Sequence, residues 1–394
     1  MKNFPTPQTQ LISWMTDIRR HLHQFPELAF EEQQTADFIS QKLDELKIAH
    51  QKNIAGTGIV ATLGKKDKDA PTVALRADMD ALPITEKTGL AFASKIPGKM
   101  HACGHDGHVA MLLGAAALLK QVKLNGCVKL IFQPAEEGTG GAQQMIAEGV
   151  LDGVDTIFAG HLDRHFEVNE IGIEPGIICA YTDEFRIEIT SKGGHAAKPH
   201  ETVDSIVVAG FLITSIQTLV SREVNPSFPS VITIGQINGG TAANIIADRV
   251  VLEGTIRTTD SESRKKLMTG LDRMVKSMDE LYQAKTLIEL TPGYPPVIND
   301  KWATAIACQA AEEVIGPDNI KPLPHPSLGG EDFSFFLQAV PGCLVRFGAR
   351  KIDNHEAPAH SPYFDFNEKA LPIGALFLAK TAVIALAHLK AGRK

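Results

Sequence analysis

Two short segments carry the side chains that could do chemistry. The first, His101-Ala-Cys-Gly-His-Asp-Gly-His108, places a thiol, three imidazoles and a carboxyl group within eight residues. The second, Gln133-Pro-Ala-Glu-Glu-Gly138, places two adjacent carboxylates directly after the apolar run Val128-Lys-Leu-Ile-Phe132. Cys, His and Glu bind zinc-like cations, and a neighbouring carboxylate outside the ligand set can act as a base on water. Together the segments predict a hydrolytic metal site.

Each segment alone has a simpler interpretation. Cys103 and His105 could be a buried thiol and a surface imidazole, and two adjacent Glu residues in a loop are usually solvated. The metal interpretation is favoured because both segments follow strand-like runs, and because further histidines occupy similar loops.

Composition excludes several classes of protein. The chain of 394 residues is too long for one ordinary core, so two domains are expected. The net charge of -7 and the lack of a Lys/Arg-rich run argue against a nucleic-acid partner. The five cysteines are an odd number without a Cys-x-x-Cys pair, which argues against a disulfide framework. A reducing, cytoplasmic location is therefore expected.

No membrane partner is expected either. The N-terminal residues lack the apolar core of a targeting segment. The most apolar long stretch, residues 371–389, predicts a packed C-terminal helix. It is interrupted by residues that disfavour a membrane span, namely Pro372, Gly374, Lys380 and His388.

Residues 1–182 alternate helix and strand patterns, which is typical of an α/β domain. Three predicted strands, 72–77, 128–132 and 155–159, each end at polar residues. These are the acidic loop Asp78-Met-Asp80, the Glu136-Glu137 pair and Gly160-His161. Because open α/β sheets place their sites outside the carboxyl ends of strands, we expect these side chains to converge.

Residues 183–293 predict a different domain. Strands are expected over 185–190, 230–237, 249–258 and 286–290, with a helix over 202–222 after the first. A second helix is indicated by apolar residues at spacings of four and three, namely Leu267, Leu271, Met274, Met278 and Leu281. The order β-α-β-β-α-β is that of the ferredoxin-like motif. Because α/β character resumes afterwards, we expect a discontinuous first domain (1–182 and 294–394) with 183–293 inserted.

The ordered set of motifs resembles the di-metal N-acyl-amino-acid amidohydrolases. These form the aminoacylase, hippurate hydrolase and auxin-conjugate hydrolase branch of the zinc carboxypeptidase-like peptidases. The resemblance covers nearly the whole chain and implies an α/β fold: a discontinuous zinc-peptidase-like catalytic domain with an inserted ferredoxin-like dimerisation or lid domain. It rests on His21-Leu-His-Gln-Phe-Pro-Glu27, Asp78-Met-Asp-Ala-Leu-Pro83, Met100-His-Ala-Cys-Gly-His-Asp106, Gln133-Pro-Ala-Glu-Glu-Gly138, Gly193-Gly-His-Ala196, Gly330-Glu-Asp-Phe333 and His360-Ser-Pro362.

The resemblance implies two divalent metal ions per subunit, Zn²⁺ or Mn²⁺, with Co²⁺ as a further option. The implied ligands are Cys103, His105, Glu137, His161 and His360. Cys103 would bridge the two ions where relatives outside this branch use Asp, and a thiolate favours softer metals such as Zn²⁺.

Other residues receive supporting roles from the same resemblance. Glu136 matches the general base. Asp78 and Asp80 resemble an acidic loop that supports the metal ligands from outside. His101 and His108 are expected to be structural.

Three residues of the inserted domain would bind substrate. His195 matches a residue that stabilises the oxyanion in the partner subunit's site. Asn244 and Arg257 fall where relatives hold the substrate carboxylate, although Arg257 could equally be a surface residue of an edge strand. A site shared in this way implies a homodimer or a higher homo-oligomer.

The leading hypothesis is metal-dependent hydrolysis of the amide bond of N-acyl amino acids of hippurate or N-acetyl type. The products would be a carboxylic acid and a free amino acid. A dipeptidase or carboxypeptidase on the same scaffold is the second hypothesis. The third is a non-catalytic metal or amino-acid binding protein, which the presence of Glu136 disfavours.

Overall fold

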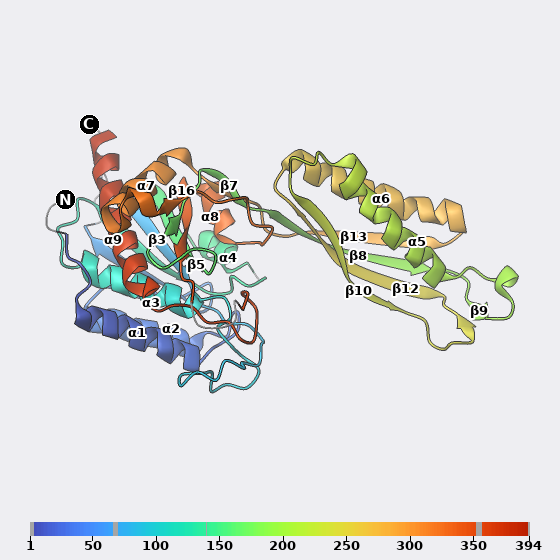
Figure 1. Cartoon of the computed structure of the whole chain (residues 1–394), viewed down its shortest axis with the longest axis horizontal. Coiled ribbons are helices and arrows are strands. Elements are labelled where there is room, and N and C mark those ends of the chain that lie inside the picture. Colours follow the sequence, from blue (N-terminus) through green and yellow to red (C-terminus); the bar gives the residue numbers. More distant parts are fainter. Residues whose placement is uncertain (1–3, 66–69, 139, 352–356, 393–394) are drawn as a thin grey trace. The chain divides into compact units, whose positions relative to one another are not determined.

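The computed structural model describes residues 4–65, 70–138, 140–351 and 357–392 (Figure 1). The chain divides into two compact units. The first comprises residues 1–176, 297–324 and 332–394, and the second comprises residues 177–296 and 325–331. The segment 325–331 thus joins the second unit, whereas the sequence pattern placed it with the first domain.

A mixed eight-stranded sheet forms the centre of the first unit. Its strands are β1 (His50–Ile54), β2 (Gly58–Gly64), β3 (Thr72–Asp78), β4 (Cys127–Gln133), β5 (Thr156–Asp163), β6 (Ile171–Gly172), β15 (Ile320–Lys321) and β16 (Gly342–Gly348). They lie in the order β1-β2-β4-β3-β5-β16-β6-β15. The central strands β4, β3, β5 and β16 run parallel, while β1 and β2 extend one edge antiparallel.

The helices of the first unit include one that is buried along its whole length. They are α1 (Thr9–Gln24), α2 (Gln33–Glu45), α3 (His105–Leu119), α4 (Gly141–Ala147), α7 (Lys301–Ile315), η3 (Pro317–Asn319), α8 (Phe333–Ala339) and α9 (Ala370–Gly392). Every residue of α3 is buried, which fits its Ala- and Leu-rich sequence. A Cβ at Gly114 of α3 would collide with Met15 Sδ of α1 and lie 2.9 Å from Ala375 Cβ of α9. Glycine therefore allows three helices to pack closely at one point.

The parallel strands place polar residues at their carboxyl ends, as predicted. Asp78 at the end of β3 pairs with Gln133 at the end of β4, and the Glu136-Glu137 pair follows β4 directly. The prediction that a strand ends at residue 159 is wrong. Strand β5 continues to Asp163 because β16, which is distant in sequence, pairs with it residue by residue, so that His161 lies opposite Arg346. His161 is therefore a strand residue rather than a loop residue.

The second unit has the predicted β-α-β-β-α-β order. Its main elements are β8 (Tyr181–Thr190), α5 (Ser205–Thr218), β10 (Ser230–Gly239), β12 (Arg249–Thr258), α6 (Ser261–Tyr282) and β13 (Lys285–Pro292). The strands form an antiparallel sheet in the order β10-β12-β8-β13. Both helices begin at an Asp whose side chain accepts backbone N–H groups, Asp204 for α5 and Asp260 for α6. This arrangement confirms the ferredoxin-like fold class.

Short elements complete the two units. They are β7 (Gly176–Cys179), β9 (Gly194–His195), η1 (Pro199–Glu201), β11 (Ile245–Ile246) and β14 (Val297–Asn299). The predicted helix over 202–222 is instead α5 followed by a π-helical turn, η2 (Leu219–Glu223). Its start is later than predicted because Asp204 caps α5.

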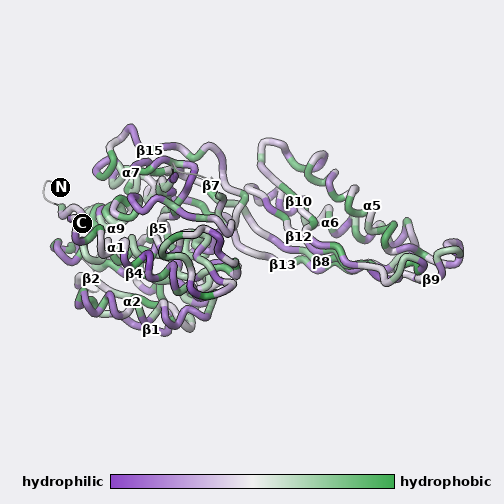
Figure 2. Tube along the Cα trace, turned by 60° about the horizontal axis from the view of Figure 1, so that its bottom comes forward, coloured by the Kyte–Doolittle hydropathy of each residue, from purple (hydrophilic) through white to green (hydrophobic). Residues whose placement is uncertain are grey.

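Two helical stretches of the described residues are long and apolar enough to cross a membrane by length and composition, 205–223 and 370–392. The window in α9 is 72% buried inside the structure, which is typical of a core helix. The window that begins with α5 is only 33% buried. Much of α5 is coloured as hydrophobic in Figure 2. Because Ile206, Val207 and Phe211 of this helix are exposed, α5 presents an apolar surface that the unit itself does not cover.

Candidate metal centre

The five predicted metal ligands come from distant parts of the chain and meet at the carboxyl end of the sheet. Cys103 lies in the loop before α3, and His105 is the first residue of that helix. Glu137 follows β4, His161 belongs to β5, and His360 lies in the segment before α9 with a left-handed φ of 65°. The backbone N–H of His360 donates to the Ala102 carbonyl at 2.8 Å, which places His360 beside the Cys103 loop.

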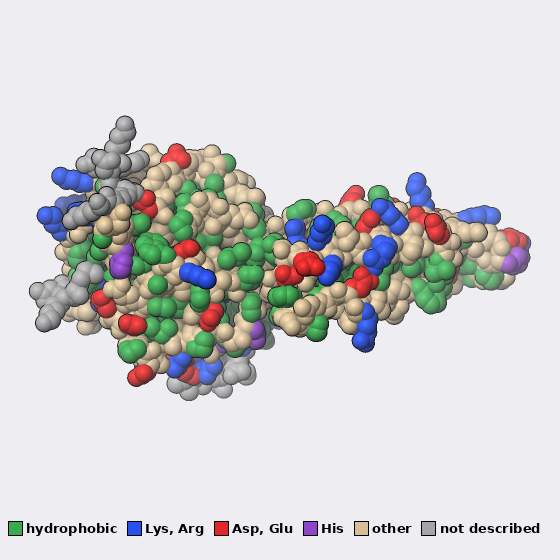
Figure 3. Space-filling model, turned by 90° about the horizontal axis from the view of Figure 1, so that it is seen from above, with side chains coloured by type: hydrophobic (Ala, Val, Ile, Leu, Met, Phe, Trp, Pro, Cys, Tyr) green, Lys and Arg blue, Asp and Glu red, His purple; other side chains and the backbone are tan. Residues whose placement is uncertain are grey.

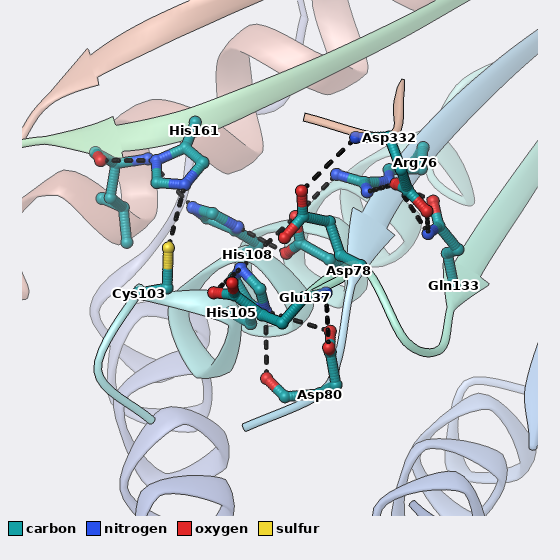
Figure 4. Close-up of polar contacts among 12 residues, drawn as sticks. Arg76, Asp78, Asp80, Cys103, His105, His108, Gln133, Glu137, His161 and Asp332 are labelled. Atoms are coloured by element: carbon teal, nitrogen blue, oxygen red, sulfur yellow. Dashed lines mark hydrogen bonds and ion pairs between the residues drawn. The ribbon is translucent and has the colours of Figure 1, made fainter. Parts of the chain in front are cut away.

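These ligand atoms form two groups of three that share the Cys103 sulfur. One group contains Cys103, His105 and His161, and the other contains Cys103, Glu137 and His360. Within each group the atoms lie within 4.8 Å of one another. Cys103 Sγ is 3.4 Å from His161 Nε2, as Figure 4 shows, and His360 Nε2 is 3.2 Å from Glu137 Oε1. Two cation sites with a common thiolate are the arrangement that this geometry allows.

Hydrogen bonds fix the tautomers of His105, which is buried, and His161, which is half-buried. His105 Nδ1 lies 2.9 Å from the Asp80 carbonyl oxygen, and His161 Nδ1 lies 2.7 Å from the Leu162 carbonyl oxygen. Because a carbonyl only accepts, each Nδ1 must carry the proton and donate it. In the neutral ring each Nε2 therefore keeps its lone pair, and this is the tautomer that binds a cation.

The chemistry of the donor set fits a cation. His105 Nε2 is buried and has no hydrogen-bond partner among the described residues, and the buried Glu137 Oε1 faces His360 Nε2 at 3.2 Å. Burial raises the pKa of the Cys103 thiol to about 12, even though His105 opposes the shift. A bound cation would reverse this shift, because metal coordination deprotonates a thiol. Burial also lowers the pKa of His161, which keeps this imidazole neutral and able to coordinate.

Glu136 lies beside the ligands but outside the two groups that share Cys103. One of its carboxylate oxygens is within 4.8 Å of ligand atoms of His105 and Glu137. Its Oε1 accepts a 3.4 Å hydrogen bond from the backbone N–H of Asp332. The side chain is only 6% exposed. A carboxylate held beside the two groups that share Cys103 is placed to exchange protons with a bound reactant.

Asp78, the last residue of β3, and Asp80, two residues later, support the ligands from outside. Asp80 Oδ1 lies 3.2 Å from His105 Nδ1, and its Oδ2 accepts from the Glu137 backbone N–H at 2.9 Å. Asp78 accepts from His108 Nδ1 at 2.6 Å. His108 Nε2 in turn accepts from the Leu162 backbone N–H at 2.9 Å, beside His161. His108 thus links β3 to β5 and has the structural position expected of it.

His101, the other histidine expected to be structural, is 2% exposed. Neither of its ring nitrogens has a hydrogen-bond partner among the residues that the structure describes. Burial lowers its pKa to about 4, so the imidazole is neutral at physiological pH.

A buried polar network beneath the centre was not predicted. Arg76 of β3 donates to Asp78 Oδ2 at 2.6 Å, to Gln133 Oε1 at 2.8 Å and to Asp332 Oδ1 at 2.9 Å (Figure 4). Asp332 also accepts from Gln133 Nε2 and from the Ala142 backbone N–H. The sequence contained one sign of this network, an Arg within an apolar strand. A buried guanidinium requires hydrogen-bond acceptors, so acceptors near Arg76 could have been expected.

A second unpredicted network anchors the start of α3. Arg19 of α1 is fully buried and donates to Asp106 Oδ2 at 3.0 Å, and His23 Nδ1 lies 2.8 Å from the same oxygen. Arg19 also bonds Asp365 and Glu368. These contacts lower the pKa of Asp106 well below its usual range although burial opposes the shift. The helix turn that begins with His105 is thereby tied to α1.

In the second unit the structure brings His195 and Asn244 together. Strand β9 pairs with β11 so that His195 lies opposite Ile245, and the Ala196 N–H donates to the Asn244 carbonyl. His195 Nδ1 accepts from the Ala197 N–H at 3.0 Å, so the neutral ring carries its proton on Nε2. The side chain is exposed. His195 therefore presents an N–H donor to solvent.

Arg257 lies elsewhere in the same unit. It belongs to β12 and pairs with Thr182 at the start of β8, whereas β9 follows the end of β8. Its guanidinium is half-buried and has no hydrogen bond or salt bridge to any residue in the described part of the chain. Burial lowers its pKa, although Glu184 and Asp183 oppose the shift. An unpaired, partly desolvated guanidinium is well suited to an anionic ligand.

Comparison with known proteins identifies the family. The model of Peptidase family M20/M25/M40 matches residues 74–383. The N-acetyl-L-cysteine deacetylase of Bacillus subtilis (strain 168) is 42% identical over 386 residues, which cover 96% of this chain and 89% of the relative. An IAA-amino acid hydrolase of Arabidopsis thaliana is 39% identical over 391 residues, which cover 98% and 88%.

A solved structure is also similar. A dinuclear metal-binding peptidase of the M20 family from Bacillus subtilis superposes with a TM-score of 0.83 and 34% identity, covering 96% of this chain and 99% of the other. The chain belongs to peptidase family M20/M25/M40. Within that family it is a metal-dependent amidohydrolase, which confirms the family, fold class and enzyme class expected from the sequence.

Proposed function

We propose that the enzyme hydrolyses the amide bond of N-acyl amino acids and releases a carboxylic acid and a free amino acid. The observation that carries this proposal is the position of Glu136. It lies within 4.8 Å of His105 and Glu137 but outside the two ligand groups that share Cys103. The names of the two relatives support the substrate class, since one is a deacetylase of an N-acetyl amino acid and the other an amino acid conjugate hydrolase.

Two divalent cations held by Cys103, His105, Glu137, His161 and His360 would polarise the amide carbonyl and increase the acidity of water. Glu136 would accept the proton of the attacking water and pass it to the leaving nitrogen. The Asp332 N–H donates to one Glu136 oxygen and so helps to hold this carboxylate beside the ligand atoms. The amide nitrogen needs this proton because an amide anion is a poor leaving group.

The second unit would supply the groups that bind the rest of the substrate. The exposed Nε2–H of His195 can donate to the oxyanion of the tetrahedral intermediate. Arg257 has an unpaired guanidinium that would hold the amino-acid carboxylate, and Asn244, beside His195, would assist.

We propose that two copies of the chain associate through the second unit. Strand β10 is an edge strand of ten residues, and a long exposed edge is normally covered. Large hydrophobic side chains are exposed on α5 and near this edge, namely Ile206, Val207, Phe211, Ile237 and Ile245. Elsewhere this unit carries Lys, Arg, Asp and Glu side chains interspersed over the face seen in Figure 3. The apolar surface is therefore the natural contact between copies.

The thiols support a proposed metal, Zn²⁺, and a proposed cellular location, the cytoplasm. A thiolate ligand favours Zn²⁺ over harder cations, while carboxylate and imidazole ligands also accept Mn²⁺ or Co²⁺. All five cysteines are free thiols, which fits the reducing cytoplasm.

A substrate panel tests the proposal. Purified enzyme would be given hippurate, a series of N-acetyl amino acids and a series of dipeptides, with released amino acid measured before and after chelator treatment and after addition of Zn²⁺, Mn²⁺ or Co²⁺. We expect release from acyl amino acids that is abolished by chelator and restored by metal. If amino acid were released from dipeptides alone, the enzyme would be a dipeptidase and the proposal would be wrong. If no substrate released amino acid, the proposal would also be contradicted.

A further inference from the structure

The loop that carries Glu136 and Glu137 contains a residue in an unusual conformation. Ala135 has a φ of 55°, in the left-handed region that non-glycine residues rarely adopt, and it is fully buried. Such a conformation persists only where surrounding contacts hold it. Its carbonyl accepts a 3.0 Å hydrogen bond from the Gly141 N–H, and its N–H donates to Glu32 Oε1 at 2.9 Å.

Glu32 is an unusual partner because it is a fully buried carboxylate. Its side chain is 0% exposed, and its Oε2 accepts from Thr57 Oγ1 at 2.7 Å. No Lys, Arg or His of the described residues forms a salt bridge with it. Burial raises its pKa. A buried carboxylate without a cation is costly to the fold, so stability alone does not account for Glu32.

The other contacts of the loop after β4 show why the hydrogen bond from the Ala135 N–H to Glu32 is important for the position of Glu136. The next residues along it are fixed by other carboxylates: Asp80 accepts from the Glu137 N–H, and Asp332 accepts from the Ala142 N–H. Between the β4 end and Glu136, however, the N–H of Ala135 is held by Glu32, a residue 103 positions earlier in the chain. Loss of that acceptor would remove one of the contacts that hold Ala135 at positive φ, and a change of φ there would rotate the peptide group that joins Ala135 to Glu136.

We infer that Glu32 is a positioning residue of the active site. By accepting the Ala135 N–H, it fixes the position of Glu136 beside the metal ligands. The inference rests on the proposed role of Glu136 as the proton carrier. It assigns Glu32 no contact with substrate or metal. Its action depends on a hydrogen-bond acceptor at Oε1 and not on negative charge.

This distinction allows a sharp test with side chains of equal length. Glu32→Gln keeps an acceptor for Ala135, and its amide can donate to Thr57, whose hydroxyl also accepts. Glu32→Met fills the same space without an acceptor. Glu27→Met is the matched control, because Glu27 is also a buried carboxylate that accepts a backbone N–H, that of Thr35 at 2.8 Å, but on α2.

We expect Glu32→Met to lower kcat on the order of 10–100-fold with KM changed less than about threefold, because a small misplacement of a reacting group is costly. Glu32→Gln should restore kcat to within about threefold of the parent. Glu27→Met should lower Tm and leave kcat unchanged. Equal kcat losses in Glu32→Met and Glu27→Met would overturn the inference, as would failure of Glu32→Gln to restore kcat.

Hydrogen exchange supplies a readout that does not depend on turnover. In metal-free protein, the peptide covering residues 133–141 should exchange faster in Glu32→Met than in the parent, in Glu32→Gln or in Glu27→Met. Unchanged exchange in Glu32→Met would overturn the inference. If Glu136→Gln kept full turnover, the proposed function would fail, whereas the exchange result would still show whether Glu32 holds this loop.

Discussion

Arg257 and His195 lie beside opposite ends of β8 in the second unit, Arg257 in the four-stranded sheet and His195 in the two-stranded sheet of β9 and β11. Arg257 pairs with Thr182 at the start of β8, and His195 follows Thr190, the last residue of that strand. Eight residues of extended chain span about 26 Å. One small acyl amino acid cannot reach both side chains of a single chain, so if both bind the same substrate, they must come from different subunits.

Mixed dimers should therefore recover activity from two inactive variants. Glu136→Gln chains and His195→Ala chains, each inactive alone, should form hybrids with one intact site, built from Glu136 of one chain and His195 of the other. Native mass spectrometry would establish that hybrids form, and amino-acid release would be measured on them. Hybrids without recovered activity would show that His195 acts within its own chain or has no catalytic role.

Glu136→Gln alone should retain metal but lose turnover on the order of 10²–10⁴-fold, because the carboxylate that carries the proton is replaced by an amide. Elemental analysis and steady-state kinetics would measure the two properties on the same sample. Near-normal turnover would mean that another group carries the proton.

Cys103→Ala should lose at least one metal ion per chain, because both ligand groups share the Cys103 sulfur. Cys343→Ala is the matched control: this thiol is also buried and its pKa is also raised to about 12, but it lies within β16, away from the ligand groups. Metal content by elemental analysis should fall only in the first variant. If Cys103→Ala kept the full number of metal ions per chain, Cys103 would not be a metal ligand and would only pack in the interior.

Asp80→Ala should weaken metal binding on the order of 10–100-fold, because Asp80 orients both His105 and Glu137. Competition with a chromophoric chelator would measure the affinity. Asp163→Ala is a suitable control: Asp163 ends β5, two residues after His161, and its side chain bonds the backbone N–H and the ring of His165 rather than a metal ligand among the described residues. Equal affinity of the two variants would contradict the orienting role of Asp80.

Asp260→Ala should lower the free energy of unfolding by about 1 kcal/mol through loss of the α6 N-cap. The hydrogen bond from the Ser263 N–H lowers the pKa of Asp260. Its contribution is therefore present above the pKa of the unfolded chain and is lost as pH falls through the lower folded pKa. Denaturant unfolding of the parent and the variant at neutral and acidic pH would measure this effect. The difference between their free energies of unfolding should become smaller as pH falls.

Local patterns were sufficient to predict most elements and the chemical nature of the site. The alternation in residues 185–190 and the spacing from Leu267 to Leu281 specify β8 and α6 because these periods depend only on neighbouring residues. His161 was misplaced because the end of β5 is set by β16, which no local pattern reveals. Arg76, Asp332 and Glu32 were missed for the same reason, since each acts through partners far away in sequence.

The discontinuous first unit has a consequence for the order in which the chain folds. Strand β16 pairs with β5, and the whole second unit is synthesised between them. Contacts of such long sequence separation close slowly, whereas the second unit is continuous apart from residues 325–331. During translation the second unit can therefore fold while β5 still lacks its neighbour β16, so the nascent first unit keeps an unpaired, aggregation-prone strand edge until Gly342–Gly348 emerges.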